Sequence, residues 1–414
     1  MERRRKPTIS FKVKVRPEDF HVVEVADLVP EGGGEYRLYR LTKSGWNTTD
    51  LLLRLAKRFG LRYQAISYGG KKDRHALTEQ YITIRDRRDF SLQEENYRLE
   101  SLGFVTQPMT PERIRGNRFL ITLRAIREPE VLFLKRNLHA IRARGVPNYF
   151  DDQRFGSYDK KRGFIAEKLL KDQWEEGLKI YLTLEYPEQT RATRKRKQFF
   201  RDHWWQWELC REHARTVTEQ MIFDYLVRRG GNYVGAMNLV PREELSLILA
   251  AYQSYLWNEM VAEMITHLAS RTLSVPGVAN SYVFYIELPE DAFDYLRALR
   301  LPTPGPKVSF PDPYTEHIFT TTLQRVGVPP SAFALKKLYR AYFSSFPRDV
   351  LVMPEGLELL DVAPDDLYPG RVKATVRFFL PRGSYGTMVL KRLTLKVKYG
   401  AADRMASAPG NPSP

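Results

Sequence analysis

One carboxylate in the chain stands among basic residues, in a pattern suited to chemistry. Asp73 lies in the segment S-Y-G-G-K-K-D-R-H-A-L-T-E-Q-Y, residues 67–81. Its nearest neighbours are Lys71, Lys72, Arg74 and His75. Adjacent cations favour an ionised carboxylate, which suits a nucleophile and not a general acid, since an acid needs a raised pKa. The same residues are also typical of a charged hairpin tip, in which Asp73 makes an ordinary turn hydrogen bond.

A second loop, residues 145–156, has the composition G-V-P-N-Y-F-D-D-Q-R-F-G. The Asn148 amide has the donor and acceptor needed to bind the Watson–Crick edge of an extruded base, and Tyr149 or Phe150 could stack on that base. The rings would equally well fill the domain core beneath a turn. The residues of the loop leave both interpretations open.

No pattern in the sequence predicts a metal or cofactor site. Asp151 and Asp152 are adjacent, so their carboxylates project in different directions, and no further ligand cluster accompanies them. Cys210 is the single cysteine, which excludes zinc sites that need two thiolates. The histidines lack H-E-x-x-H spacing, and no phosphate-binding loop, dinucleotide fingerprint or G-x-S-x-G elbow occurs.

Local patterns predict the elements that position the two loops. The segments A-I-S-Y and Q-Y-I-T-I flank Asp73 and favour strands, and residues 9–15 alternate in polarity as a half-buried strand does. Helical spacing over 47–60 predicts a helix that Thr48 or Thr49 caps and Gly60 ends. A second helix, 130–144, ends at Gly145, directly before the second loop.

Beyond residue 156 helical periodicity dominates, until strand patterns return at 371–381 and 391–398. We therefore predict an α+β protein in which a mostly helical α/β insertion interrupts a β-rich domain. The expected β-rich domain comprises residues 1–157 and 346–400, and the insertion comprises 158–345. Residues 401–414 are small, polar and proline-containing, and are expected to form a flexible tail.

The charge of the chain indicates a polyanionic partner. Its 414 residues include 66 Lys and Arg against 49 Asp and Glu, a formal net charge of +17. Basic residues are dense in 191–201 and 371–398, and the 22 Phe, 23 Tyr and 6 Trp offer rings for base stacking. Nucleic acid is therefore favoured over a membrane. With no signal peptide and no long apolar run, we expect a cytoplasmic protein.

Several motifs, in this order, resemble those of the TruD family of tRNA pseudouridine synthases. They are P-E-D-F-H-V-V-E (17–24), L-T-K-S-G-W-N-T (41–48), G-K-K-D-R-H-A-L-T-E-Q (70–80), I-R-G-N-R-F (114–119), the whole second loop, A-A-Y-Q-S-Y-L-W-N (250–258) and F-L-P-R-G-S-Y-G-T (379–387). The chain departs from the family pattern at Asp151, where a glycine is usual. The resemblance covers both ends of the expected β-rich domain and part of the insertion.

The resemblance implies a catalytic domain with a mixed, mainly antiparallel sheet and a TruD-specific insertion domain. It implies cofactor-free isomerisation of a uridine in tRNA, at position 13, with no metal and no obligate protein partner. Asp73 matches the catalytic aspartate. The implied substrate-binding and RNA-binding residues are Phe20, Lys43, Lys72, Asn148, Phe150 and Arg154.

Two other functions are compatible with parts of the sequence. A non-catalytic RNA-binding or RNA-folding protein would use the basic and aromatic surfaces alone, and would not need Asp73. A metal-dependent nuclease would use Asp151 and Asp152, and a chelator would abolish its activity.

Overall fold

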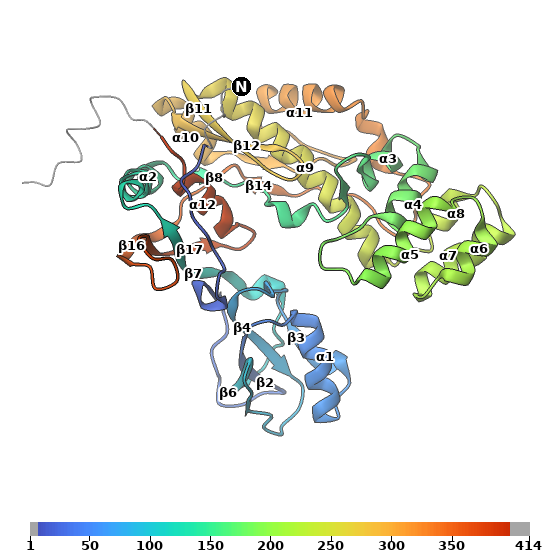
Figure 1. Ribbon diagram of the computed structural model, residues 1–414, viewed down its shortest axis with the longest axis horizontal. Helices are drawn as coiled ribbons and strands as arrows, with labels where there is room; N and C mark the ends of the chain where they lie inside the picture. The colour runs from blue at the N-terminus through green and yellow to red at the C-terminus, as the bar shows by residue number, and fades with distance from the viewer. Residues whose placement is uncertain (1–6, 398–414) are drawn as a thin grey trace, which may run out of the picture. The chain divides into compact units, whose positions relative to one another are not determined.

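The computed structural model describes residues 7–397 (Figure 1). The chain divides into two compact units, Met1–Val146 with Val352–Pro414, and Pro147–Leu351. The domain boundaries expected from sequence fall after residue 157 and after residue 345. Both positions lie within the second unit, so residues 147–157 group with that unit. That this unit is the TruD-type insertion domain stays a prediction, and the expected tail lies outside the described residues.

A mixed sheet forms the first unit, with strand order β16-β17-β7-β1-β4-β2-β6-β5 and with β3 paired to β4. β1 and β4 run parallel, and the other neighbouring pairs within this sheet are antiparallel. The strands are β1 (Phe20–Ala26), β2 (Tyr36–Lys43), β3 (Ile66–Tyr68), β4 (Leu77–Ile84), β5 (Leu92–Gln93), β6 (Tyr97–Val105), β7 (Ile114–Ile126), β16 (Glu355–Pro364) and β17 (Val372–Pro381). The predicted mainly antiparallel sheet is confirmed.

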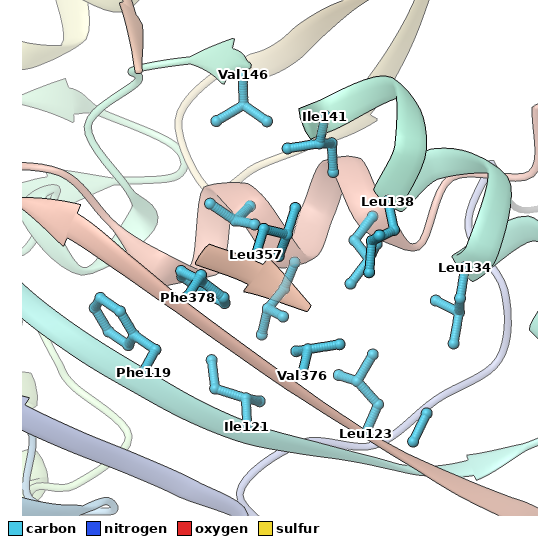
Figure 2. Packing of buried hydrophobic residues seen from close by; sticks show 14 of the residues in the cluster. Phe119, Ile121, Leu123, Leu134, Leu138, Ile141, Val146, Leu357, Val376 and Phe378 are labelled. Atoms are coloured by element: carbon cyan, nitrogen blue, oxygen red, sulfur yellow. The ribbon is translucent and has the colours of Figure 1, made fainter. Parts of the chain in front are cut away.

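Apolar residues of this sheet pack against α1 (Thr48–Phe59), α2 (Val131–Arg144) and α12 (Gly386–Leu393). Figure 2 shows one hydrophobic core of the first unit, in which Leu134, Leu138 and Ile141 of α2 face strand residues such as Ile121 and Val376. Both predicted helices are therefore present. Gly60 ends α1 with φ of 66°, as expected, but the residue at the N-cap position is Asn47, not Thr48 or Thr49.

Two predicted strands are absent from the described residues. Within 9–15 the structure has one isolated bridge, Lys12 to Arg124, and a second bridge joins the preceding Thr8 to Leu395. The alternation there reflects burial, because Ile9 is in the core while Phe11 and Val13 pack against it. The strand predicted at 391–398 is also wrong, because residues 391–393 form the end of α12. Lys398 lies outside the described residues.

The second unit is mostly helical. Its helices are α3 (Ile165–Leu170), α4 (Trp174–Thr183), α5 (Arg191–Asp202), α6 (Trp207–His213), α7 (Val217–Arg228), α8 (Tyr233–Met237), α9 (Arg242–Leu268), α10 (Glu290–Ala298) and α11 (Pro313–Val326). Its strand pairs are β9 (Tyr158–Asp159) with β10 (Gly163–Phe164), β11 (Arg271–Pro276) with β12 (Ser281–Glu287), and β13 (Arg300–Pro302) with β14 (Pro347–Asp349). Two short strands, β8 (Val146–Pro147) and β15 (Leu351–Val352), lie at the unit boundaries.

The long helix α9 supplies much of this unit's buried surface, including Trp257. No helix within residues 7–397 is long and apolar enough to cross a bilayer.

Candidate active site

Asp73 lies in the loop that joins the antiparallel strands β3 and β4. One carboxylate oxygen, Oδ1, accepts a 2.8 Å hydrogen bond from the backbone N–H of His75, and Oδ2 pairs with the ammonium of Lys14. Burial by itself raises the pKa of Asp73. The hydrogen bonds from Lys14 and His75, together with their charges, outweigh that effect and hold the pKa below its usual value. Asp73 is therefore an anion at neutral pH, as predicted.

The cation that holds Asp73 comes from a distant part of the sequence. Lys14 adopts a left-handed backbone conformation with φ of 55°, which is uncommon for a residue with a side chain. Its Nζ also lies 4.4 Å from the centroid of the Phe20 ring, a cation–π contact. Lys14 thus links two predicted site residues, Asp73 and Phe20. Sequence reasoning missed it because residues 9–15 resembled an ordinary strand.

The cations adjacent to Asp73 in sequence have other contacts. Lys72 Nζ lies 2.7 Å from the buried Glu24 carboxylate and donates to Asn117 Oδ1 at 2.7 Å. Arg74 Nε donates to the Gly45 carbonyl. The predicted sign of the electrostatic effect on Asp73 is correct, but Lys72 and Arg74 are not its hydrogen-bond donors.

Lys43 holds the backbone of the Asp73 loop through hydrogen bonds. Its side chain is fully buried, and Nζ donates to the backbone carbonyls of Trp46, Lys72 and Asp73 at 2.9, 3.4 and 3.1 Å. Burial lowers the pKa of Lys43 to about 8, although the Asp73 charge acts in the opposite direction. Thr48 adds a further support by accepting from the Lys72 N–H at 3.0 Å. These bonds fix the backbone that carries Asp73.

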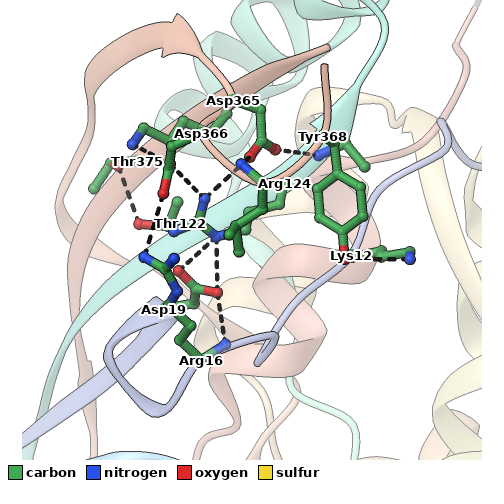
Figure 3. Close-up of polar contacts among 12 residues, drawn as sticks. Lys12, Arg16, Asp19, Thr122, Arg124, Asp365, Asp366, Tyr368 and Thr375 are labelled. Carbon is green, nitrogen blue, oxygen red and sulfur yellow. Dashed lines mark hydrogen bonds and ion pairs between the residues drawn. The ribbon is translucent and has the colours of Figure 1, made fainter. Parts of the chain in front are cut away.

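A buried ionic network holds the segment that carries Lys14 (Figure 3). Arg124 of β7 donates through Nε to both carboxylate oxygens of Asp19, at 2.8 and 2.9 Å, and through Nη1 to Asp365 and Asp366. The backbone groups of Arg124 and Lys12 also exchange hydrogen bonds. The P-E-D-F motif therefore contributes an aspartate that anchors the chain next to the site.

Residues 147–156 of the second loop lie in the second unit, with Asn148 and Phe150 both buried. Arg348 Nη2 donates to the Asn148 carbonyl and to its Oδ1, at 2.6 and 2.9 Å, and the guanidinium lies 4.1 Å from the Phe150 ring centroid. The Asn258 side chain makes two hydrogen bonds to the Phe150 backbone: Oδ1 accepts from its N–H and Nδ2 donates to its carbonyl. Arg348 and Asn258 are supports that sequence reasoning missed.

Asp152 has a structural role in this loop. Its Oδ1 accepts from the Val278 N–H and from the Tyr282 hydroxyl, both at 2.8 Å. Within residues 7–397 no group of three or more His, Cys, Asp or Glu is placed to hold a metal ion. The nuclease hypothesis therefore gains no support from Asp151 and Asp152.

The basic segment 191–201 forms helix α5, and its cations fall into two groups. Lys197 is buried and donates to the Leu184 carbonyl, while Arg196 and Arg201 pair with Glu219 and Glu185. Exposed cations remain on the outer face: Arg191, Arg194 and Lys195. Only these exposed cations are available to bind phosphates.

Within residues 371–397, several basic residues of the stretch 371–398 are paired inside their own unit. Lys373 and Arg377 form ion pairs with Asp366 and Glu358, and Arg392 is buried against Asn137. Phe378 stacks on Phe119 inside the core. An RNA-binding role for this stretch stays a prediction.

The predicted site residues therefore form two groups. Phe20, Lys43, Lys72 and Asp73 belong to the first unit, whereas Asn148, Phe150 and Arg154 belong to the second. A mainly antiparallel sheet that carries an anionic aspartate on a hairpin loop defines the class of protein: an α+β protein with an ionised carboxylate at the edge of its sheet domain.

The sequence model of the family described as tRNA pseudouridine synthase D (TruD) matches residues 4–279, more than half of the chain. The chain belongs to this family. A probable tRNA pseudouridine synthase D 2 of Methanocaldococcus jannaschii is 32% identical over 397 residues, covering 94% of this chain and 92% of that protein. The tRNA pseudouridine synthase D of Leptospira interrogans serogroup Icterohaemorrhagiae serovar copenhageni is 30% identical over 398 residues, covering 93% and 96%.

Similarity extends to a solved structure. The crystal structure of a putative tRNA pseudouridine synthase D (TruD) from Methanosarcina mazei superposes with a TM-score of 0.72 at 25% sequence identity, covering 95% of each chain. The resemblance stated from the motifs and the predicted α+β fold class are both confirmed.

Proposed function

We propose that this chain isomerises a uridine of tRNA to pseudouridine, at position 13, with Asp73 as the catalytic carboxylate. Family membership supports the substrate and the reaction. The observation that carries the role of Asp73 is its half-buried carboxylate, held as an anion by Lys14 and by the His75 N–H. Because the substrate is tRNA, the enzyme is expected to act in the cytoplasm.

The reaction breaks the N1–C1′ bond of uridine, turns the uracil and joins C5 to C1′. C5 loses its proton and N1 gains one, so the product is an isomer and no redox or group-transfer cofactor is required. An ionised Asp73 can attack C1′ and form a glycosyl ester, or remove the C2′ proton to give a glycal. Deuterium at C2′ of the target uridine separates the routes, because only the glycal route breaks the C2′–H bond and shows a primary isotope effect.

The supporting contacts explain how the chain would serve this chemistry. Lys43 and Thr48 hold the loop backbone, and Lys14 keeps the carboxylate ionised next to the Phe20 ring. Extruding the uridine costs a few kcal/mol, which stacking on an aromatic residue and phosphate contacts would offset. Phe150 and Asn148 are the proposed base contacts, and Arg154 and Lys72 the proposed RNA contacts.

The decisive experiment replaces Asp73 by Asn, which has the same shape without the charge. We expect pseudouridine formation in unmodified tRNA to fall by about a thousandfold or more, with tRNA affinity retained. Asp89→Asn, a change of the same kind at an exposed site, should leave activity unchanged. Undiminished activity of the Asp73→Asn variant would favour the non-catalytic RNA-binding alternative. Mapping the product tests position 13.

A further inference from the structure

The second unit contains an open pocket of about 320 Å³ that the proposed reaction does not use. It lies between the second loop, α4 and α9. Tyr186, in the segment that follows α4, lines one side. The residues that matter for the argument are Arg154, Ser157, Tyr181, Tyr186 and Glu244. A cavity of this size accommodates a nucleobase with part of its sugar phosphate.

The polar groups of the pocket have spare hydrogen-bonding capacity. Arg154 is half-buried, and among the described residues its side chain donates a single hydrogen bond, a 3.4 Å contact from Nε to Ser254 Oγ. The Ser157 hydroxyl is buried, with the residue 7% exposed, and it has no hydrogen-bond partner within residues 7–397. Buried polar groups are usually satisfied, so the Ser157 hydroxyl leaves hydrogen-bonding capacity unused beside the pocket.

Two side chains of the pocket can contact a ligand: the Glu244 carboxylate as an acceptor and the Tyr186 ring as a stacking surface. Tyr181 donates its hydroxyl hydrogen to Glu244 Oε2 at 2.7 Å, which orients the carboxylate. Oε1 and the second lone pair of Oε2 remain to accept from a ligand. Tyr186 is 37% exposed, and the Lys197 ammonium lies 5.1 Å from its ring centroid. A partly exposed tyrosine beside a basic helix suits base stacking.

We propose that this pocket binds an unpaired guanosine of the tRNA, distinct from the uridine that is isomerised. Arg154 contacts a phosphate, Tyr186 stacks on the base, and Glu244 accepts from the base edge. Guanine is the natural match because its Watson–Crick edge carries both an imino N1–H and an N2 amino group, two adjacent donors for one carboxylate. The exposed cations of α5 would extend the phosphate contacts. The inference rests on the proposed tRNA substrate.

The test is inosine interference, since inosine is guanosine without the N2 amino group. A tRNA transcript with inosine phosphorothioate scattered at guanosine positions is bound to the wild type, and the bound and free fractions are sequenced. We expect inosine to be depleted at one position from the bound fraction. For Glu244→Gln that depletion should vanish and the Kd for normal tRNA should rise about tenfold. Glu243→Gln, the adjacent exposed residue on α9, is the matched control and should behave as the wild type.

Two further experiments, on Tyr186 variants and on guanosine monophosphate, distinguish the possible results. Tyr186→Leu should weaken tRNA binding while Tyr186→Phe retains it. Guanosine monophosphate should bind weakly and compete with tRNA; tight binding without competition would indicate a free-nucleotide site and overturn the proposal. Inosine tolerated at every position, or depletion that persists in Glu244→Gln, would also overturn it. Interference measures binding alone, so failure of the wild type to form pseudouridine would count against the proposed function and not against this pocket.

Discussion

Lys14 and Asp73 form an ion pair although 59 residues separate them in the sequence. The side chain of Lys14 is 25% exposed and that of Asp73 26%, so water screens the pair only in part. The cations next to Asp73 in sequence contact other groups. The ionisation of the Asp73 carboxylate therefore depends on a residue outside its own loop.

The first prediction concerns Lys14→Met. Because the pKa of Asp73 lies below its usual value of 3.8, the carboxylate is ionised above about pH 5 and wild-type activity should show no acid limb from this group there. Without Lys14, burial still raises the pKa of Asp73, and only His75 remains to lower it. The acid limb should then move to higher pH and the rate at a fixed acidic pH should fall. Single-turnover rates of pseudouridine formation across pH measure this shift.

Lys71→Met is the control for that experiment, since it removes an exposed lysine from the same loop. Its pH profile should match the wild type. An unchanged acid limb in the Lys14 variant would show that the ion pair does not set the ionisation of Asp73.

The second prediction concerns the buried pair of Glu24 and Lys72, whose charged atoms lie 2.7 Å apart. Lys72→Met leaves the fully buried Glu24 carboxylate without its cation, which should cost about 3–5 kcal/mol of unfolding free energy. Adding Glu24→Gln should recover most of that loss, because the glutamine Oε1 can still accept from the Tyr81 N–H. Urea unfolding of the single and double variants measures both effects, and additive losses would contradict this coupling.

These pairs also show how far the sequence predicts the site. The β3–loop–β4 hairpin and the end of α2 follow from local signals, namely strand patterns around two glycines and a helix that stops at Gly145. The partners of Asp73 and Lys72 come from residues 14 and 24, and no local pattern encodes a contact over that separation. Alternation at 9–15 correctly placed Ile9, Phe11 and Val13 toward the core, but Val15 is exposed and only one isolated bridge, at Lys12, forms there.

The third prediction concerns Arg348, which orients the Asn148 amide and covers the Phe150 ring. Lysine keeps the charge but lacks the planar fork, so Arg348→Lys cannot reproduce both hydrogen bonds and the stacking together. We expect a loss of about 1–3 kcal/mol in unfolding free energy and a lower rate of pseudouridine formation at saturating tRNA. Arg300→Lys, in an exposed ion pair with Asp349, should change stability by less than about 1 kcal/mol. Equal effects of the two substitutions would contradict the positioning role.

The last prediction separates the two groups of cations on α5. Replacing exposed Arg194 and Lys195 by glutamate should weaken tRNA binding and reduce the slope of log affinity against log salt, by about one for each phosphate that the variant no longer binds. Lys197→Glu should instead lower stability, because its ammonium is buried against the Leu184 carbonyl. Binding across a salt series and urea unfolding measure the two effects. Unchanged affinity of the Arg194 and Lys195 variant at every salt concentration would mark this face of α5 as solvated surface.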